Sequence, residues 1–261
     1  MYILKVNKLT KTFSGLTAVA NINMELKPGE LIGLIGPNGA GKTTVFNLLT
    51  GVYVPTAGTM FFTKDGKEIP LHGKKPHIIC KDGLARTFQN IRLFKDLTVF
   101  DNVRIAMHKN VKYSIISSFF HLPSYFREEK QLYEDTMELL KIFRLDDKKD
   151  EYAKNLPYGD QRRLEIARAL ATEPSLLLLD EPAAGMNPAE TRDLVELISW
   201  IRDRFNLTIL LIEHDMHVVM NICERIYVLD HGMVIANGTP DEIKRNKQVI
   251  EAYLGEDIEN A

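Results

Sequence analysis

The sequence contains few cysteines and no long apolar run, and both absences narrow the class of protein. Cys80 and Cys223 are the two cysteines among 261 residues, and they lie far apart without the spacing of metal ligands. This pattern favours reduced thiols in a cytoplasmic compartment. No apolar stretch approaches the roughly 18 residues that a membrane-spanning helix requires, and the N-terminus lacks the apolar core of a signal peptide. We therefore expect any membrane association to come through a partner.

The chain also lacks an excess of charge of either sign. Lys and Arg number 33 against 35 Asp and Glu, for a net charge of −2, so no general basic field predicts a nucleic-acid partner. The seven histidines are scattered without metal-ligand spacing, so no zinc site is expected. The hydrophobic content of 45% is ordinary for one or two globular units.

A phosphate-binding pattern is the most informative feature that is present. Residues 36–44 read GPNGAGKTT and match G-x-x-x-x-G-K-[ST]. The pattern follows an apolar run at residues 31–35 and opens a helix over residues 42–50, which is the order of strand, loop and helix that the motif requires. Its glycines allow backbone N–H groups to surround a triphosphate, and the helix N-terminus adds positive potential. The expected nucleotide-binding residues here are Gly36, Pro37, Asn38, Gly39, Ala40, Gly41, Lys42, Thr43 and Thr44.

Three side chains of this loop have separate expected roles. Lys42 should reach the β- and γ-phosphates, and the Thr43 hydroxyl is placed for a magnesium ion. Thr44 is expected to pack or to cap the helix.

The rest of the chain alternates between two kinds of architecture. Short β segments at 2–6, 22–27 and 59–62 predict a small antiparallel sheet, whereas the continuous apolar runs at 176–179 and 209–212 predict parallel strands buried on both faces. We expect helices near 99–109, 126–144 and 160–172, a long loop at 63–83, and a hairpin of residues 225–229 and 233–236 followed by two short helices. The prediction is one domain over residues 1–261, with a helical subdomain inserted at about 90–165.

The segment at residues 156–182, LPYGDQRRLEIARALATEPSLLLLDEP, resembles the signature motif, connecting helix and Walker B motif of ABC-type ATPases. Together with GPNGAGKTT, LARTFQN around Gln89 and LIEHD around His214, the resemblance covers almost the whole chain in the family's order. It implies an α/β fold with a RecA-like P-loop ATPase core, an antiparallel β subdomain and an inserted α-helical subdomain. It also implies ATP and Mg²⁺ as cofactors and ATP hydrolysis as the activity.

Within the family, two further segments favour a subgroup. LARTFQNIRLFKDLTVFDNV and DEPAAGMNP resemble the ATP-binding subunits of branched-chain amino acid importers. Subunits that serve urea, other amides or lipopolysaccharide look similar, so the transported solute stays open.

The resemblance and the residue chemistry together assign catalytic roles. Asp180 ends an apolar strand, where its carboxylate would hold hydrated magnesium, and Glu181 is the candidate general base for the attacking water. By resemblance, His214 contacts the γ-phosphate and orients the water, and Gln89 contacts magnesium or water and senses the nucleotide. Taken alone, an acidic pair could be a solvated loop and His214 an ordinary surface histidine.

Adenine is expected to stack on Phe13, which stands where the family places an aromatic ring, and Val19 would complete that surface. The alternative is that Phe13 is a core aromatic of the small β-sheet.

The signature segment departs from the family pattern. Pro157 replaces the usual serine, so a hydroxyl is missing and the N–H groups of Tyr158, Gly159 and Asp160 are expected to face a phosphate held by a second copy. Asp160 is expected to cap the helix start. Asn187 stands where the family commonly has aspartate, and its neighbourhood would signal between the two sites.

The implied partners are a second ATP-binding subunit, identical or paralogous, integral membrane permease subunits, and indirectly a solute-binding protein. The chain would then lie at the cytoplasmic face of the membrane. For the permease we predict a docking surface at residues 89–100 and 113–126, centred on Phe94, although the aromatic residues Phe119, Phe120, Tyr125 and Phe126 could instead close a helical core. Two rival interpretations are a soluble ABC ATPase of DNA repair or translation and a solitary P-loop kinase.

Overall fold

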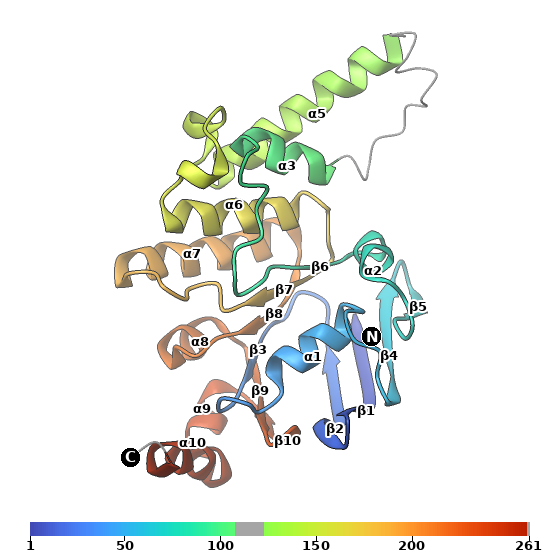
Figure 1. Ribbon diagram of the computed structural model, residues 1–261, viewed down its shortest axis with the longest axis vertical. Helices are drawn as coiled ribbons and strands as arrows, with labels where there is room; N and C mark the ends of the chain where they lie inside the picture. The colour runs from blue at the N-terminus through green and yellow to red at the C-terminus, as the bar shows by residue number, and fades with distance from the viewer. Residues whose placement is uncertain (108–122, 260–261) are drawn as a thin grey trace.

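The computed structural model describes residues 1–107 and 123–259, which contain two β-sheets (Figure 1). The first sheet has four strands in the order β2-β1-β4-β5, and each neighbouring pair is antiparallel. These strands are β1 (Leu4–Phe13), β2 (Leu16–Leu26), β4 (Ala57–Lys64) and β5 (Lys67–Pro70). The expected antiparallel sheet is confirmed, and its strands extend further than the apolar segments alone indicated.

The second sheet forms the centre of the molecule and has six strands in the order β10-β9-β3-β8-β7-β6. Its strands are β3 (Leu31–Ile35), β6 (Leu84–Arg86), β7 (Leu176–Asp180), β8 (Thr208–Ile212), β9 (Arg225–Asp230) and β10 (Met233–Gly238). All pairs are parallel except β9 with β10, which form the expected hairpin. Every residue of β3, β7 and β8 is buried, as expected for strands that are covered on both faces.

Two separate hydrophobic cores cover the two faces of this sheet. On one face, Ile32, Leu178 and Leu210 pack with the first sheet and with α1 (Lys42–Leu49). On the other face, Leu31, Leu177 and Leu211 pack with a set of helices. These helices are α3 (Val99–Met107), α5 (Pro123–Ile142), α6 (Tyr158–Leu170), α7 (Pro188–Phe205) and α8 (Met216–Ile222). The helix that follows the phosphate loop and the helix that follows the signature segment therefore lie on opposite faces of one sheet (Figure 1).

The remaining helical elements are short connections and the C-terminal part. Two 3-10 turns, Asp146–Lys148 and Ala153–Asn155, join α5 to α6. The chain after the hairpin forms α9 (Pro240–Lys244) and α10 (Lys247–Glu259), so the two expected terminal helices are present. Helices α3, α5 and α6 stack above the sheet in Figure 1, and they overlap the three predicted helical segments. The proposed limits of a helical subdomain, about 90–165, stay a prediction.

The prediction of a long loop at residues 63–83 is wrong. That stretch contains β5 and helix α2 (Pro76–Asp82). Asp65 and Gly66, with φ of 50° and 77°, form the turn of the β4–β5 hairpin, and both residue types tolerate that left-handed backbone. Pro76 occupies the first turn of α2, where its missing N–H costs nothing. In residues 1–107 and 123–259, no helix combines the length and the low charge that crossing a membrane would need.

Candidate active site

The phosphate loop connects β3 to α1, and its backbone conformation requires glycine at two points. Gly36 and Gly41 have φ of 149° and 101°. A Cβ atom at Gly36 would lie 2.0 Å from the Leu229 carbonyl oxygen, and one at Gly41 would lie 2.7 Å from the Ala18 carbonyl oxygen. By contrast, a Cβ at Gly39 would meet no atom within 4 Å among the described residues. The loop is thus pressed against the protein at both ends and faces open space in the middle, which suits the seating of a phosphate chain.

Lys42 lies inside this loop. Its Nζ donates to the carbonyl oxygens of Gly36 and Pro37 at 2.6 and 2.8 Å. The ammonium group is buried and held at the loop's centre, ready to exchange carbonyl partners for phosphate oxygens. Thr43 is exposed at the start of α1, and Thr44 is half-buried within the helix, whose N-cap is Gly41.

Asp180 ends β7 as a buried carboxylate with two different oxygen environments. Its Oδ2 accepts from the Arg86 Nη2 at 2.6 Å, whereas its Oδ1 is buried and has no hydrogen-bond partner among the described residues. A buried anionic oxygen without a partner is the kind of group that an ordered water or a hydrated cation satisfies. The described part of the chain contains no cluster of three or more His, Cys, Asp or Glu that could hold a metal ion by itself. A cation at Asp180 would therefore take its other ligands from waters and from a bound phosphate, as Mg²⁺ commonly does.

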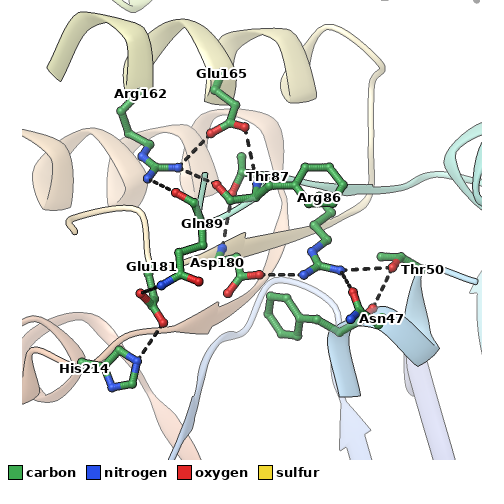
Figure 2. A network of polar contacts seen from close by, with 12 residues as sticks. Asn47, Thr50, Arg86, Thr87, Gln89, Arg162, Glu165, Asp180, Glu181 and His214 are labelled. Atoms are coloured by element: carbon green, nitrogen blue, oxygen red, sulfur yellow. Dashed lines mark hydrogen bonds and ion pairs between the residues drawn. The ribbon is translucent and has the colours of Figure 1, made fainter. Parts of the chain in front are cut away.

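Glu181, Gln89 and His214 come together next to Asp180 (Figure 2). The Gln89 Nε2 donates to the Glu181 Oε2 at 2.8 Å, and the His214 Nε2 lies 2.7 Å from the Glu181 Oε1. An ionised carboxylate only accepts, so the bond to His214 places the imidazole proton on Nε2. Glu181 is buried and has a left-handed φ of 48°, whereas the His214 side chain is 47% exposed. Strained backbone of this kind is found preferentially at functional sites.

Directly before His214 stands Glu213, a buried carboxylate that sequence reasoning did not single out. It accepts from the backbone N–H groups of Ala183 and His214, at 2.8 and 3.2 Å. Burial raises the pKa of the Glu213 carboxyl above its usual value, and the charge of nearby Glu181 adds to that shift. Glu213 thereby fixes the loops that follow β7 and β8 to each other.

Arg86 is a second residue that sequence reasoning missed. Besides Asp180, its guanidinium donates to the Asn47 Oδ1 at 2.6 Å and to the Thr50 Oγ1 at 3.4 Å (Figure 2). It therefore ties the Asp180 carboxylate to helix α1. Its place three residues before Gln89 was visible in the sequence, but nothing in periodicity or spacing distinguishes it from a surface arginine.

The signature segment differs from expectation at Asp160. Helix α6 begins at Tyr158 with Pro157 at the N-cap position and no side-chain cap, so the predicted capping role of Asp160 is wrong. The Asp160 Oδ2 instead lies 2.5 Å from the Lys148 Nζ, in an ion pair. Asn187 is the residue with a capping role, because it begins α7 in a reciprocal capping box with Glu190.

The two residues predicted to hold adenine lie in different environments. Phe13 ends β1 and is 37% exposed, in edge contact with the Tyr53 ring at 5.1 Å between centroids, so it is not a core aromatic. Val19 is fully buried beneath the phosphate loop, close to Gly41. Their contact with adenine stays a prediction. Of the docking residues, Phe119 and Phe120 lie outside the described residues, and Tyr125 and Phe126 contact each other at 5.5 Å between ring centroids.

Comparison with known proteins agrees with this geometry. The profile of the ABC transporter family matches residues 19–184, and a profile of the branched-chain amino acid ATP-binding cassette transporter matches residues 233–259. The chain is 49% identical to the high-affinity branched-chain amino acid transport ATP-binding protein LivG of Escherichia coli (strain K12), over 97% of this chain and 98% of LivG. It is 46% identical to the corresponding protein BraF of Pseudomonas aeruginosa, with the same coverage.

Solved structures give the same result. The ATP-binding cassette MJ1267 in its ADP conformation superposes with a TM-score of 0.82 at 28% identity, covering 98% of this chain and 99% of that one. The RecA-like core with its antiparallel sheet and added helices is thus the fold of ABC ATPases. The phosphate loop, the Glu181 group and these matches lead to one conclusion: the chain belongs to the ABC transporter family as an ATP-binding, ATP-hydrolysing subunit.

Proposed function

We propose that the chain powers the uptake of branched-chain amino acids as a peripheral subunit on the cytoplasmic face of a membrane. The observation that carries the ATPase part is the group of Gln89, Glu181 and His214 beside the phosphate loop. The solute is supported by the similarity to LivG and BraF and by the subgroup profile at residues 233–259. Partners are a second ATP-binding subunit, membrane permease subunits and, through them, a solute-binding protein.

In the proposed mechanism, Glu181 accepts the proton of a water that attacks the terminal phosphate of ATP. Each carboxylate oxygen has two acceptor positions, so Glu181 can keep its bonds to Gln89 and His214 and still take that proton. Lys42 would hold the β- and γ-phosphates. Mg²⁺ fits beside the Asp180 Oδ1, which has no hydrogen-bond partner among the described residues. The Thr43 hydroxyl and the Gln89 side chain are the other proposed ligands. When bound, the ion would neutralise charge on the phosphates.

The second subunit is supported by the position of the signature segment. Within one chain, Tyr158 and Gly159 start a helix on the opposite face of the central sheet from the phosphate-loop helix. This placement supports the proposal that they contact a phosphate held by another copy. We therefore propose a composite site between two subunits, identical or paralogous.

The proposed docking site for the permease is a groove between α2, α3 and α6. Its lining includes Val52, Arg92, Phe94, Ile105, Arg168 and Thr172. The Phe94 ring is 50% exposed and lies 5.4 Å from the Arg168 guanidinium carbon. We propose that a helix of the permease lays its apolar side over Phe94 and that the helical subdomain, at about 90–165, moves it when ATP binds.

The test is reconstitution in vesicles with the permease subunits, followed by measurement of leucine uptake driven by MgATP. Uptake of leucine but not of urea supports the proposed solute, whereas uptake of urea alone, or binding to DNA or ribosomes in place of membranes, contradicts it. Phe94→Asp should abolish transport and co-purification with the permease while ATP hydrolysis by the isolated subunit is nearly unchanged. The control is Ile250→Asp, an exposed apolar residue remote from the groove, which should transport normally. Normal co-purification of Phe94→Asp would refute the docking site.

A further inference from the structure

Helix α6 contains a buried ion pair that lies outside the catalytic group. Arg162 and Glu165 are three residues apart, with the Arg162 Nη1 at 2.8 Å from the Glu165 Oε2, and their side chains are 0% and 2% exposed. Burying two charges costs free energy that their mutual attraction seldom returns in full, and apolar residues of similar volume often serve stability equally well. The Arg162 Nε, moreover, has no partner among the described residues. The pair is therefore poorly explained as a stabilising device, and its other contacts must account for it.

Those contacts are to the backbone of the segment that carries Gln89. Arg162 donates to the carbonyl oxygens of Phe88 and Gln89 at 2.7 and 2.8 Å, and Figure 2 shows its bond to Gln89. The Glu165 Oε1 accepts from the N–H groups of Phe88 and Arg92 at 3.4 and 3.1 Å. Residues 88–92 belong to no helix or strand, so these polar groups are paired by side chains of α6 in place of a regular backbone ladder. The segment is thus attached to α6.

A continuous polar path then joins the signature segment to the catalytic carboxylate of the same chain. The Arg162 Nη2 also donates to the Tyr158 hydroxyl at 3.2 Å. From Arg162 the path continues to the Gln89 backbone, and the Gln89 side chain bonds the Glu181 Oε2 at 2.8 Å. Arg162 and Glu181 are buried along this path, whereas Tyr158 and Gln89 are exposed, so a displacement of α6 acts on Gln89 through its backbone bond to the buried Arg162.

We propose that Arg162 and Glu165 are positioning residues that hold Gln89 against Glu181 and make residues 88–92 move with α6. When the partner subunit presents a phosphate at Tyr158 and Gly159, α6 moves. Gln89 then shifts Glu181, the catalytic carboxylate in the ATP site of its own chain. This proposal rests on the proposed function and adds a route of communication between the two ATP sites.

The test is a double-mutant cycle on the full chain. Arg162→Lys keeps the charge beside Glu165 but cannot reproduce the forked contacts to two carbonyl oxygens. We expect turnover to fall about 10- to 100-fold, because a misplacement on the order of 1 Å at a catalytic group costs that much. The affinity for ATP should stay near the wild-type value, since the phosphate loop is untouched. In the Gln89→Ala background, the same change should cost less than about threefold, because the two residues act through one contact.

A second variant and a control separate positioning from folding. Arg162→Met combined with Glu165→Met removes both buried charges at once, and it should show the same loss of turnover and a Hill coefficient for ATP close to one. Arg104→Met with Glu129→Met removes an ion pair between α3 and α5 that does not touch residues 88–92, and it should behave as the wild type. Equal losses with and without Gln89, or wild-type turnover in both Arg162 variants, would overturn the inference. Failure of the wild type to hydrolyse MgATP would instead contradict the proposed function.

Discussion

Replacing Glu181 by glutamine tests the catalytic assignment with little disturbance of the fold. The new amide oxygen can accept from the Gln89 Nε2, and the new amide nitrogen can donate to the His214 Nε2 once that imidazole carries its proton on Nδ1. Both contacts therefore survive in shape. What disappears is the ability to take a proton from water.

The expected size of the effect follows from general-base catalysis, which contributes about 10²- to 10⁴-fold to turnover. At about 1.4 kcal/mol for each tenfold change in rate, the activation barrier should rise by about 3–6 kcal/mol. Affinity for MgATP should stay close to the wild-type value because Lys42 and the phosphate loop are untouched. The uncleaved ATP should then hold two subunits together.

The assay combines phosphate release in a single turnover with gel filtration in MgATP. We expect Glu181→Gln to elute as an ATP-bound dimer and to release phosphate at least about 100-fold more slowly than the wild type. Glu196→Gln, at an exposed position of α7, removes a carboxylate far from the site and should match the wild type in both measurements. Turnover within about tenfold of the wild type in Glu181→Gln would show that another group is the base.

Three further predictions concern residues outside the catalytic group. Pro157→Ala should keep most ATPase activity and Gly159→Asp should lose it. Gly159→Ala should fold normally, because the nearest atom to its new Cβ would lie 3.4 Å away. Equal loss of activity in Pro157→Ala and Gly159→Asp would show that the proline shapes the loop. Asn187→Ala should lower the stability by about 1 kcal/mol and the melting temperature by about 2–4 °C, whereas Asn187→Asp keeps the cap and should melt with the wild type. Burial raises the pKa of the Cys223 thiol to about 12, so iodoacetamide at pH 8 should alkylate it about 1,000-fold more slowly in the folded chain than in urea. The stability of the folded chain should also fall as the pH rises above the pKa that this thiol has in the unfolded chain. Rapid alkylation of the native chain would refute both expectations.

The central fold could be predicted from sequence wherever the burial of an element sets a clear pattern of apolar residues. The apolar runs of β3, β7 and β8 are buried on both faces, and the phosphate loop has its expected place between strand and helix. The error at residues 63–83 arose because glycine and proline were taken as loop residues. In α2 and the β4–β5 turn, the same residue types instead begin a helix and close a hairpin.

Only some residues of the candidate site could be predicted from the sequence. The positions of Gln89, Glu181 and His214 were predicted from the resemblance to a family, and the structure brings their side chains together. Arg86 and Arg162 could not be found this way, because each acts on groups that lie far away in sequence, and nothing in a side chain's neighbours reveals which distant carbonyl or carboxylate it will meet. The capping role expected for Asp160 failed for the same reason, since its partner Lys148 lies before the helix in a separate turn.

The pairing of the central sheet also sets the order in which the chain can assemble during its synthesis. Strand β3 ends at Ile35, but both of its neighbours, β8 and β9, begin only at Thr208 and Arg225. At a translation rate of about 5–20 residues per second, the ATP-binding loop emerges from the ribosome roughly ten seconds or more before the strands that hold it. The first antiparallel sheet, whose strands are all complete by Pro70, can form much earlier. Nascent chains that stop before β8 should therefore expose an apolar β3 and depend on chaperones, and ATP binding should appear only once β9 is complete at Asp230.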